Sequence, residues 1–473
     1  MKIPHIVGAI ALTLGLVACA TPAGPLSTTQ AIAQPRAVSD STRLQLESLI
    51  QNVSGAQAKR YNATDSASHT MDCLKIIPNP NVAGQFLGVY HCYFNGGSTA
   101  YVCLATSTDL LNWTFVRTLA GASGSNATQP TIIAVGTGFM VAWEQEPNNH
   151  VKLAYFTSWA NLQANTVSKS MDLPRQLSTY AEGTPSFYSA TATSADIGFH
   201  YYQNGTVDRQ ARGQMANWST WTSSAQTAID NAMLYYGVGG NIGDRDTVVS
   251  QGYSFNIQEA GGNNSDFGSW RVFLYDAQTG NADKLSIQTD GGSKAFANPT
   301  ATLTTLGSQT VLVCTLFVPT ENSAAGEKGE LIYYSPVSSA WDRLYEAEAS
   351  PMLHTIGKAD GTGWSASTGT DAAGYLLYGP DATDIPTGNR GAIFKITEDN
   401  NTANSDQVAT LDVYDATSGT VLGTRSLLRT DFLSANHPDV FRVNFTNPSA
   451  HKVEFRINWT KKAYLNVDNV VVN

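Results

Sequence analysis

Ala181-Glu182-Gly183-Thr184-Pro185-Ser186-Phe187 places an acidic residue, a Gly and a Pro directly before an aromatic residue. This order is typical of a loop that enters a strand, because Gly lets the backbone approach a neighbour closely and Pro fixes the entry angle. Four other stretches resemble it, and each is followed by two or three strand-like runs. They are His69-Thr70-Met71-Asp72, Gln129-Pro130-Thr131-Ile132, Gly243-Asp244-Arg245-Asp246 and Ala297-Asn298-Pro299-Thr300.

The spacing of these five stretches, roughly 53 to 62 residues, is about that of one propeller blade. Each stretch presents a polar residue where an apolar strand begins. The sequence therefore predicts an all-β fold, with a five-bladed β-propeller over residues 61–340 whose polar openings converge on one axis.

The composition favours an extracellular all-β protein. Only 14% of the 473 residues are charged, while the chain holds 40 Gly and 20 Tyr. The net charge is −10, and no basic stripe is present to neutralise phosphates. We therefore expect no nucleic-acid partner.

Residues 1–20 predict a signal peptide. One Lys precedes an apolar run over residues 6–17, and small residues follow. Leu16-Val17-Ala18-Cys19 also resembles a bacterial lipobox, which would lipidate Cys19 and anchor the protein to a membrane. Asn-X-Ser/Thr sites favour a secreted glycoprotein instead. Examples of these sites are Asn62, Asn112, Asn126, Asn204, Asn217, Asn444 and Asn458.

Residues 21–60 predict a linker that ends in a short helix. The first part is rich in Thr, Ala, Pro and Gln without apolar periodicity. Residues 41–53 then carry Leu44, Leu46, Leu49 and Ile50 at helical spacing.

Four cysteines follow Cys19, and an even number in an oxidising compartment predicts two disulfides. Cys92 and Cys103 lie on successive strands of the first repeat and could pair across a hairpin. Cys73 and Cys314 are expected on inner strands of the first and last repeats, where a disulfide would close the ring. Zinc is the alternative, but no CxxC pair supports it.

From residue 341 the strands become shorter and alternate, which predicts a β-sandwich of the jelly-roll type over residues 341–473. Its opening, Tyr345-Glu346-Ala347-Glu348, and its close, Asn466-Val467-Asp468-Asn469, look like those of carbohydrate-binding modules of families 6 and 35. The resemblance implies a structural calcium ion held by Glu346, Glu348 and Asp468, for which a solvated edge is the alternative. Sugar-stacking aromatics could be Trp364, Tyr375, Tyr378 or Trp459.

The polar openings of the repeats provide carboxylates together with amide and guanidinium donors, which glycoside cleavage requires. The pattern over residues 68–336 resembles the five-bladed propeller glycosidases of families 43, 62, 32 and 117. The resemblance implies a general base, Asp72, on the first blade and a general acid, Glu182, on the third. Their third acid lies on the second blade, where this chain has Gln129. Asp246, Glu144 or Glu146 could supply it.

The remaining predicted substrate-binding residues are His69, Gln129, Trp143, Asp244, Arg245 and Asn298. Structural alternatives exist for several residues: Asp72 could cap a turn, Asp246 could pair with Arg245, and His69 could hydrogen-bond a neighbour.

We therefore hypothesise a secreted, monomeric glycoside hydrolase that needs no cofactor for catalysis and binds a cell-wall polysaccharide or oligosaccharide. Asp72, Glu182 and Asp246 are its expected catalytic residues, and a furanoside substrate of the arabinofuranosidase or arabinanase kind is expected. The alternative is a non-catalytic carbohydrate-binding propeller, a lectin. A third interpretation, a sialidase or arabinanase with a further blade, lacks a sixth opening.

Overall fold

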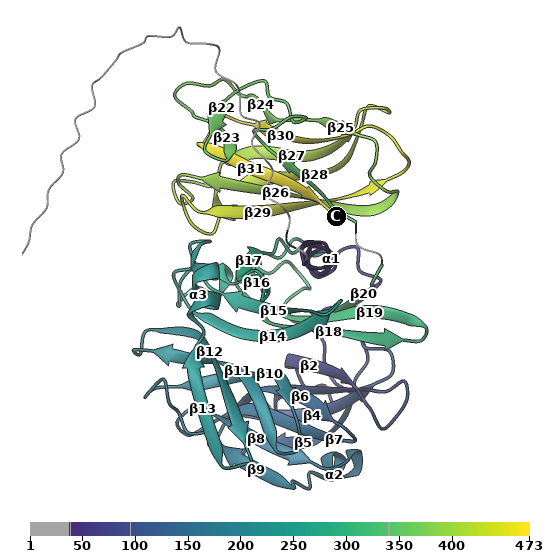
Figure 1. Ribbon diagram of the computed structural model, residues 1–473, viewed down its shortest axis with the longest axis vertical. Coiled ribbons are helices and arrows are strands. Elements are labelled where there is room, and N and C mark those ends of the chain that lie inside the picture. Colours follow the sequence, from purple (N-terminus) through teal and green to yellow (C-terminus); the bar gives the residue numbers. More distant parts are fainter. Residues whose placement is uncertain (1–36, 38, 95, 339–340) are drawn as a thin grey trace, which may run out of the picture. The chain divides into compact units, whose positions relative to one another are not determined.

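The computed structural model describes residue 37 and residues 39–94, 96–338 and 341–473; the side chains of Asp244 and Arg245 are also outside this description. The described residues belong to one compact unit of the chain. Strands dominate them, which confirms the prediction of a mostly β protein (Figure 1). The predicted signal peptide, Cys19 and most of the predicted linker lie outside the described residues.

The predicted N-terminal helix is confirmed as α1 (Asp40–Gln51). Its apolar side buries Leu46 and Ile50 against the fourth and fifth of the sheets described below. The hydroxyl of Tyr333 donates a hydrogen bond of 2.7 Å to the carbonyl of Ile50, which ties the end of the helix to the fifth sheet. In the part of the chain that the structure describes, no helix is long and apolar enough to cross a membrane.

Five antiparallel sheets of four strands follow one another along the chain, and we call them blades 1 to 5. Blade 1 contains β2 (Asp72–Pro78), β3 (Phe86–Tyr93), β4 (Ala100–Ser107) and β5 (Thr114–Ala120). Blade 2 contains β6 (Ala127–Val135), β7 (Gly138–Gln145), β8 (His150–Phe156) and β9 (Lys169–Asp172). Blade 3 contains β10 (Glu182–Ala190), β11 (Ser194–Gln203), β12 (Val207–Ala216) and β13 (Thr220–Ala225).

Blade 4 contains β14 (Ile242–Ser250), β15 (Tyr253–Ala260), β16 (Arg271–Asp276) and β17 (Asn281–Lys284). Blade 5 contains β18 (Ala297–Leu306), β19 (Gln309–Val318), β20 (Gly329–Pro336) and, from the other end of the chain, β1 (Ala58–Arg60). The fifth blade thus takes a strand from the segment that we expected to be linker. Short helices α2 (Trp159–Ala164), α3 (Thr227–Leu234) and η1 (Phe267–Ser269) lie between strands.

The first strands of the five blades form a closed ring. In this ring β2 contacts β6, β6 contacts β10, β10 contacts β14, β14 contacts β18, and β18 returns to β2. Apolar side chains fill the space between neighbouring blades; Trp143 of blade 2 and Val102 of blade 1, for example, share one core. The ring therefore closes through hydrophobic packing of adjacent blades.

The same irregularity occurs near the start of every first strand. The register with the second strand shifts there in all five blades. In four of them the central residue has a positive φ: Cys73 (56°), Gln129 (51°), Thr184 (52°) and Asn298 (48°). Such bulges turn a side chain toward a site that a regular strand would not reach. We call this end of the ring the mouth.

The C-terminal residues form two sheets that share one hydrophobic core. One sheet has the order β22-β23-β31-β26-β29 with β21 beside β31, and the other has β24-β30-β27-β28 with β25 beside β30. Phe394 of the first sheet and Leu411 and Ile457 of the second lie in the same core. The strands are β21 (Arg343–Glu346), β22 (Lys358–Asp360), β23 (Gly363–Ala366), β24 (Gly374–Leu377), β25 (Pro380–Ala382), β26 (Gly388–Glu398), β27 (Gln407–Asp415), β28 (Thr420–Leu428), β29 (Pro438–Asn447), β30 (Val453–Trp459) and β31 (Leu465–Val472), with η2 (Arg429–Asp431) after β28.

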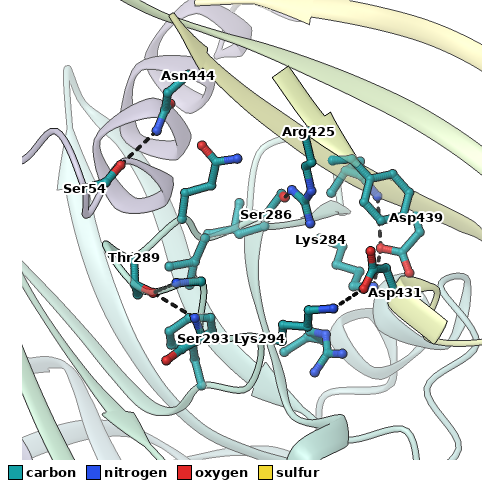
Figure 2. Close-up of a pocket in the computed structure, with 18 of the residues that line it drawn as sticks. Ser54, Lys284, Ser286, Thr289, Ser293, Lys294, Arg425, Asp431, Asp439 and Asn444 are labelled. Carbon is teal, nitrogen blue, oxygen red and sulfur yellow. Dashed lines mark hydrogen bonds and ion pairs between the residues drawn. The ribbon is translucent and has the colours of Figure 1, made fainter. Parts of the chain in front are cut away.

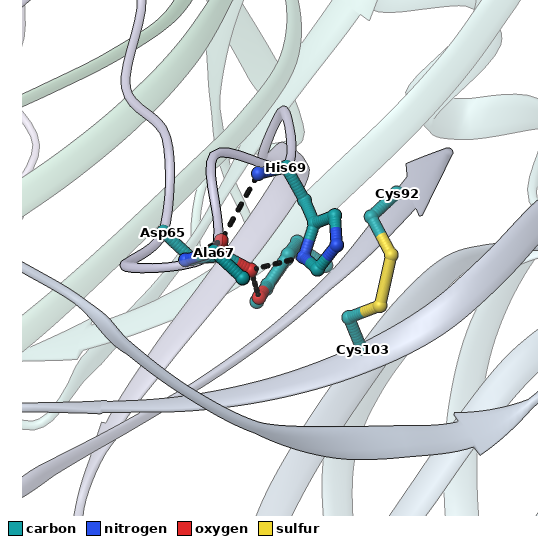
Figure 3. The surroundings of a disulfide bond; sticks show 6 residues. Asp65, Ala67, His69, Cys92 and Cys103 are labelled. Carbon is teal, nitrogen blue, oxygen red and sulfur yellow. Dashed lines mark hydrogen bonds and ion pairs between the residues drawn. A yellow bond between two sulfur atoms is a disulfide. The ribbon is translucent and has the colours of Figure 1, made fainter. Parts of the chain in front are cut away.

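One of the two predicted disulfides is present. Cys92 of β3 and Cys103 of β4 are joined across the adjacent strands of blade 1 (Figure 3). The predicted Cys73–Cys314 disulfide is not formed. Cys314 lies on β19, the second strand of blade 5 and not the first, while the sulfur of Cys73 contacts Oε1 of Gln129. Burial raises the pKa of the Cys314 thiol to about 12.

Candidate functional site

The mouth of the ring is lined by one residue from each second strand. Register pairs place His91 opposite Asp72, Glu144 opposite Thr128, His200 opposite Gly183 and Phe317 opposite Ala297. Glu259 occupies the corresponding place in blade 4, between the partners of Ile242 and Arg245. Equivalent positions of the five second strands thus supply two imidazoles, two carboxylates and one aromatic ring.

One cluster of polar groups lies where blades 1 and 2 meet. Nε2 of His91 is 3.5 Å from Oδ2 of Asp72. The backbone N–H of Gln129 donates to Nδ1 of His91 at 3.5 Å. Tyr93 lines the same cavity as Asp72, and burial and then the charge of Asp72 raise the pKa of its phenol. Asp72 is half-buried, so its carboxylate keeps access to solvent.

A second cluster surrounds Gly183 where blades 2 and 3 meet. A Cβ at Gly183 would lie only 1.9 Å from Oε2 of Glu144, so the Glu144 carboxylate occupies the space of a missing side chain. Asn149 donates a hydrogen bond of 2.6 Å to Oε1 of Glu144. His200, opposite Gly183, contacts the hydroxyl of Thr184 at 2.7 Å through Nδ1.

Asp208, at the start of β12, completes this second cluster. Its Oδ1 is 3.8 Å from Nε2 of His200. Burial raises the pKa of Asp208 to about 6, although the charge of Arg209 partly opposes the shift. A carboxyl group in this range holds a proton in mildly acidic solution, when an ordinary Asp is already ionised.

Glu182, the predicted general acid, supports the backbone instead of facing the mouth. Its side chain is buried, with 3% of the residue exposed. Oε1 accepts hydrogen bonds from the backbone N–H groups of Gln176 (2.8 Å), Leu177 and Ser178 (3.0 Å). One oxygen of Glu182 is thus shared by three backbone donors of the preceding loop.

Asp246, the predicted third acid, lies inside the ring and not at the mouth. Nζ of Lys75, from blade 1, donates to Oδ2 of Asp246, and the backbone N–H of Ala301 donates to the same oxygen at 3.1 Å. Both charged side chains are buried. They line a cavity of about 250 Å³ within the ring, together with Phe187 and Tyr188. The ion-pair partner of Asp246 is thus Lys75 and not Arg245, the partner considered from the sequence.

His69 and Trp143 have structural partners. Nδ1 of His69 lies 2.8 Å from Oδ2 of Asp65 (Figure 3). The His69 ring also makes edge contacts with Phe94 and Phe115. Trp143 is buried in the core between blades 1 and 2, which is not a position for binding substrate.

Asn298 and Gln129, by contrast, are both bulge residues of the mouth. The backbone N–H of Asn298 donates to Oε2 of Glu259, which joins blades 4 and 5. Asp244 and Arg245 lie in β14, but their side chains are outside the described residues. Glu146 accepts a hydrogen bond of 2.8 Å from the Asn126 side chain, so Glu144 is the acid of this pair that reaches the mouth.

A cavity of about 580 Å³ extends from the mouth along blades 1 and 5. Asp72, Tyr93 and Phe317 line it, with Lys328 and Glu330. Tyr93 is 37% exposed and Phe317 is half-buried, so both rings offer an open face next to charged groups.

The three predicted calcium ligands are neighbours at the ends of the two-sheet region, because β21 pairs with β31. Burial, followed by the charges of Asp468 and Glu348, raises the pKa of Glu346. Lys395 Nζ lies 3.1 Å from Asp468 Oδ2 and already neutralises it. Among the described residues, no group of three or more His, Cys, Asp or Glu side chains is arranged to hold a metal ion. Oε2 of Glu348 is buried and has no hydrogen-bond partner in the part of the chain that the structure describes, a feature that fits a bound cation.

No protein-family profile and no curated protein matches this sequence. Among solved structures, an exo-β-1,3-galactanase from Phanerochaete chrysosporium with galactose is 14% identical, with a TM-score of 0.38 over 88% of this chain and 99% of that chain. A thermostable family 43 glycoside hydrolase is 13% identical, with a TM-score of 0.40 over 60% and 92%. A family 32 β-fructofuranosidase from Bombyx mori is 10% identical, with a TM-score of 0.38 over 91% and 96%. At these identities and TM-scores, the similarities support no statement about activity.

Sequence reasoning missed His91, His200, Asp208 and Glu259. A signal was present for His91 and His200, because each follows apolar or aromatic strand residues, where a polar residue needs a partner. Glu259 lies in a strand with other polar residues and gave a weaker signal. Asp208 gave no comparable signal, since it follows a loop in which acidic residues are ordinary.

Proposed function

We propose that this protein is a secreted glycoside hydrolase and that its active centre is the mouth of a five-bladed β-propeller. The observation that carries the proposal is the presence of two carboxylate–imidazole clusters on either side of Gln129. Glycoside cleavage needs one carboxyl group that protonates the leaving oxygen and another that activates water or attacks the anomeric carbon. The Asp72–His91 and Glu144–His200–Asp208 clusters offer these groups from opposite sides of blade 2.

In this proposal Asp208 is the proton donor, because burial raises its pKa to about 6. Asp72 keeps the role of base that sequence reasoning assigned to it, supported by its half-buried position in the cavity of the mouth. Glu144 supplies the third carboxylate. Its charge and its hydrogen bond from Asn149 suit an acceptor for substrate hydroxyl groups.

The cavity beside the mouth suits a sugar ring. Tyr93 and Phe317 present aromatic faces on which the apolar face of a sugar can stack, and Asp72 and Lys328 can bind hydroxyl groups. We keep a furanoside-containing cell-wall polysaccharide as the proposed substrate class. The two-sheet C-terminal region is proposed to be a carbohydrate-binding module.

The test is release of reducing ends from a panel of arabinans, arabinoxylans, arabinogalactans and fructans. Asp72→Asn and Asp208→Asn should each lower kcat at least 100-fold on any substrate that the wild type cleaves. Asp196→Asn is the matched control, because Asp196 lies in blade 3 at the start of β11, paired with Arg212 at 2.7 Å. Wild-type activity in either mouth variant would overturn the assignment.

A second candidate function is carbohydrate binding without catalysis. It is favoured by the structural use of two predicted catalytic acids, Glu182 in backbone hydrogen bonds and Asp246 in a buried ion pair. The two functions separate in one experiment. Binding to one polysaccharide by the wild type, without hydrolysis on the whole panel, would establish the lectin and exclude the hydrolase.

A further inference from the structure

A cavity of about 450 Å³ has two walls (Figure 2). One wall is blade 4 together with the segment that follows it, and the other is formed by strands β28 and β29 of the two-sheet region. Its volume falls within the range of roughly 300–1,000 Å³ that is typical of small-molecule sites. Four cationic side chains line it, Arg271, Lys284, Lys294 and Arg425, but only two anionic ones, Asp431 and Asp439. The lining therefore carries an excess of positive charge.

Each of the two lysines forms an ion pair with one of the two carboxylates. Nζ of Lys284 forms a buried ion pair with Asp439, and Nζ of Lys294 pairs with Asp431 (Figure 2). Each pair is close to neutral as a unit. The excess charge of the cavity is therefore that of Arg271 and Arg425.

Neither arginine forms an ion pair with a carboxylate among the residues that the structure describes. Arg271 donates to the carbonyl groups of Gly268 (2.9 Å) and Trp270 (3.0 Å) through one terminal nitrogen. Arg425 likewise uses one terminal nitrogen, toward the hydroxyl of Ser286 (2.8 Å) and the carbonyl of Arg442 (3.2 Å). In each guanidinium group the remaining nitrogens have no hydrogen-bond partner within that part of the chain.

Both arginines are half-buried and keep unused hydrogen-bond donors. Burial lowers the pKa of Arg271 and of Arg425, although the charges of Asp431 and Asp439 partly oppose both shifts. At Arg425 the charge of Arg271 adds to the lowering. Two guanidinium groups that repel each other across a hollow would be stabilised by an anion placed between them. Guanidinium groups bind planar carboxylates through two parallel hydrogen bonds, so a carboxylate fits their free nitrogens.

The rest of the lining is suited to a polyhydroxylated molecule. Ser54 and Ser426 provide hydroxyl groups, and Gln288 and Asn444 provide amide oxygens. The hydroxyls of Thr289 and Ser293 also line the cavity, but both already donate to Glu327. Hydroxyl groups donate and accept, and amide oxygens accept, which is what sugar hydroxyls require. The volume also exceeds what a single inorganic anion fills.

We propose that this cavity binds a small polyhydroxylated carboxylate of the hexuronate class, with its carboxylate held between Arg271 and Arg425. The site is separate from the mouth of the ring and does not depend on glycoside hydrolysis there.

Calorimetry and thermal unfolding of the full chain test the proposal, at constant ionic strength. The probes are sodium galacturonate and sodium glucuronate. Galactose, with the same ring but no carboxylate, and sodium sulfate and phosphate are the comparisons. We expect a uronate to give a saturable heat signal and to raise the Tm. Its affinity should be at least 10-fold higher than that of galactose. Equal effects of galactose and uronate, no uronate binding, or tighter binding of sulfate or phosphate would overturn the proposal.

Variants locate the site. Arg271→Gln and Arg425→Gln should each weaken uronate binding at least 10-fold. Arg390→Gln is the matched control, because Arg390, like Arg271, donates to backbone carbonyls and does not line the cavity. Removal of an uncompensated charge should also raise the Tm of the ligand-free Arg→Gln variants. Unchanged uronate affinity in both variants would overturn the assignment, and if either variant fails to fold, the wild-type comparison of uronate with galactose still decides the proposal.

Discussion

Lys75 in the first blade and Asp246 in the fourth form a buried ion pair inside the ring. The two residues are 171 positions apart in the chain, and they occupy corresponding places on their first strands. The hydroxyl of Thr302 in blade 5 accepts a further hydrogen bond of 3.1 Å from Lys75. The pair therefore connects three blades across the interior of the ring.

Loss of one member of this pair should destabilise the protein strongly. Asp246→Ala leaves the ammonium group of Lys75 buried without its carboxylate, which costs about 3–5 kcal/mol in the free energy of unfolding. Urea denaturation measures this loss. The double variant Lys75→Met, Asp246→Leu should recover most of it, because neither charge then remains buried. Activity that disappears in the folded double variant would instead support a catalytic role for Asp246.

Substitutions of Glu182 separate a structural role from an acid role. Glu182→Gln keeps an oxygen that can accept the backbone hydrogen bonds, so kcat should stay within about 5-fold of the wild type. Glu182→Ala removes the acceptor and should cost about 1–3 kcal/mol of stability. Chemical denaturation and steady-state kinetics check the two effects. A 100-fold loss of kcat in a stable Gln variant would restore the predicted general acid.

Gly183→Ala should disturb the mouth without unfolding the ring. The new Cβ would meet Oε2 of Glu144, the far end of a flexible side chain, so the carboxylate has to move. We expect kcat/KM to fall about 10-fold, mainly through KM, because Glu144 is proposed to bind substrate hydroxyls. Gly369→Ala is the control, since a Cβ there meets no atom within 4 Å. An unchanged kcat/KM in Gly183→Ala would argue against a role for Glu144 in binding substrate hydroxyls.

The raised pKa of Asp208 predicts a dependence of both stability and activity on pH. Between pH 3.8 and about 6 the folded state holds a proton on Asp208 that the unfolded chain releases. This contribution to stability is present below pH 3.8 and is lost as the pH rises through about 6. Asp208→Asn should therefore be more stable than the wild type above pH 6, by on the order of 2 kcal/mol, and the difference should vanish near pH 4.

Activity provides the second measurement on Asp208. If this group donates the proton, kcat/KM of the wild type should fall above pH 6. A wild-type profile without a basic limb in that region would contradict the proposed acid.

Calcium should stabilise the two-sheet region if a cation satisfies the orphaned oxygen of Glu348. Addition of millimolar CaCl₂ should raise the Tm, and EDTA should reverse the effect. Glu348→Gln removes the charge and should abolish the shift. An unchanged wild-type Tm would mean that Lys395 supplies all the positive charge that Asp468 needs, and the calcium proposal would fail.

Local patterns were sufficient for the secondary structure and for contacts between neighbouring strands. The helix that follows Asp40, the strand runs of each repeat and the Cys92–Cys103 disulfide were all predicted, because each depends on residues close together in the chain. The polar-residue–Pro openings also marked where first strands begin. They occur at Gln129-Pro130 and Asn298-Pro299, and both became bulges with a positive φ.

Tertiary structure alone decided which acidic residues face the mouth. A bulge shifts the strand register by one residue, and a shift of one residue moves a side chain to the opposite face of a sheet. Glu182 therefore accepts hydrogen bonds from backbone N–H groups of a preceding loop. Glu144 and His200, which lie at the mouth, belong to second strands. The partner of Asp246 came from another blade, and Cys314 lay on a second strand away from Cys73. Charge pairing and register are set by packing between segments distant in the chain, so the sequence by itself determined the strands and their repeat, whereas the closed ring determined the composition of the site.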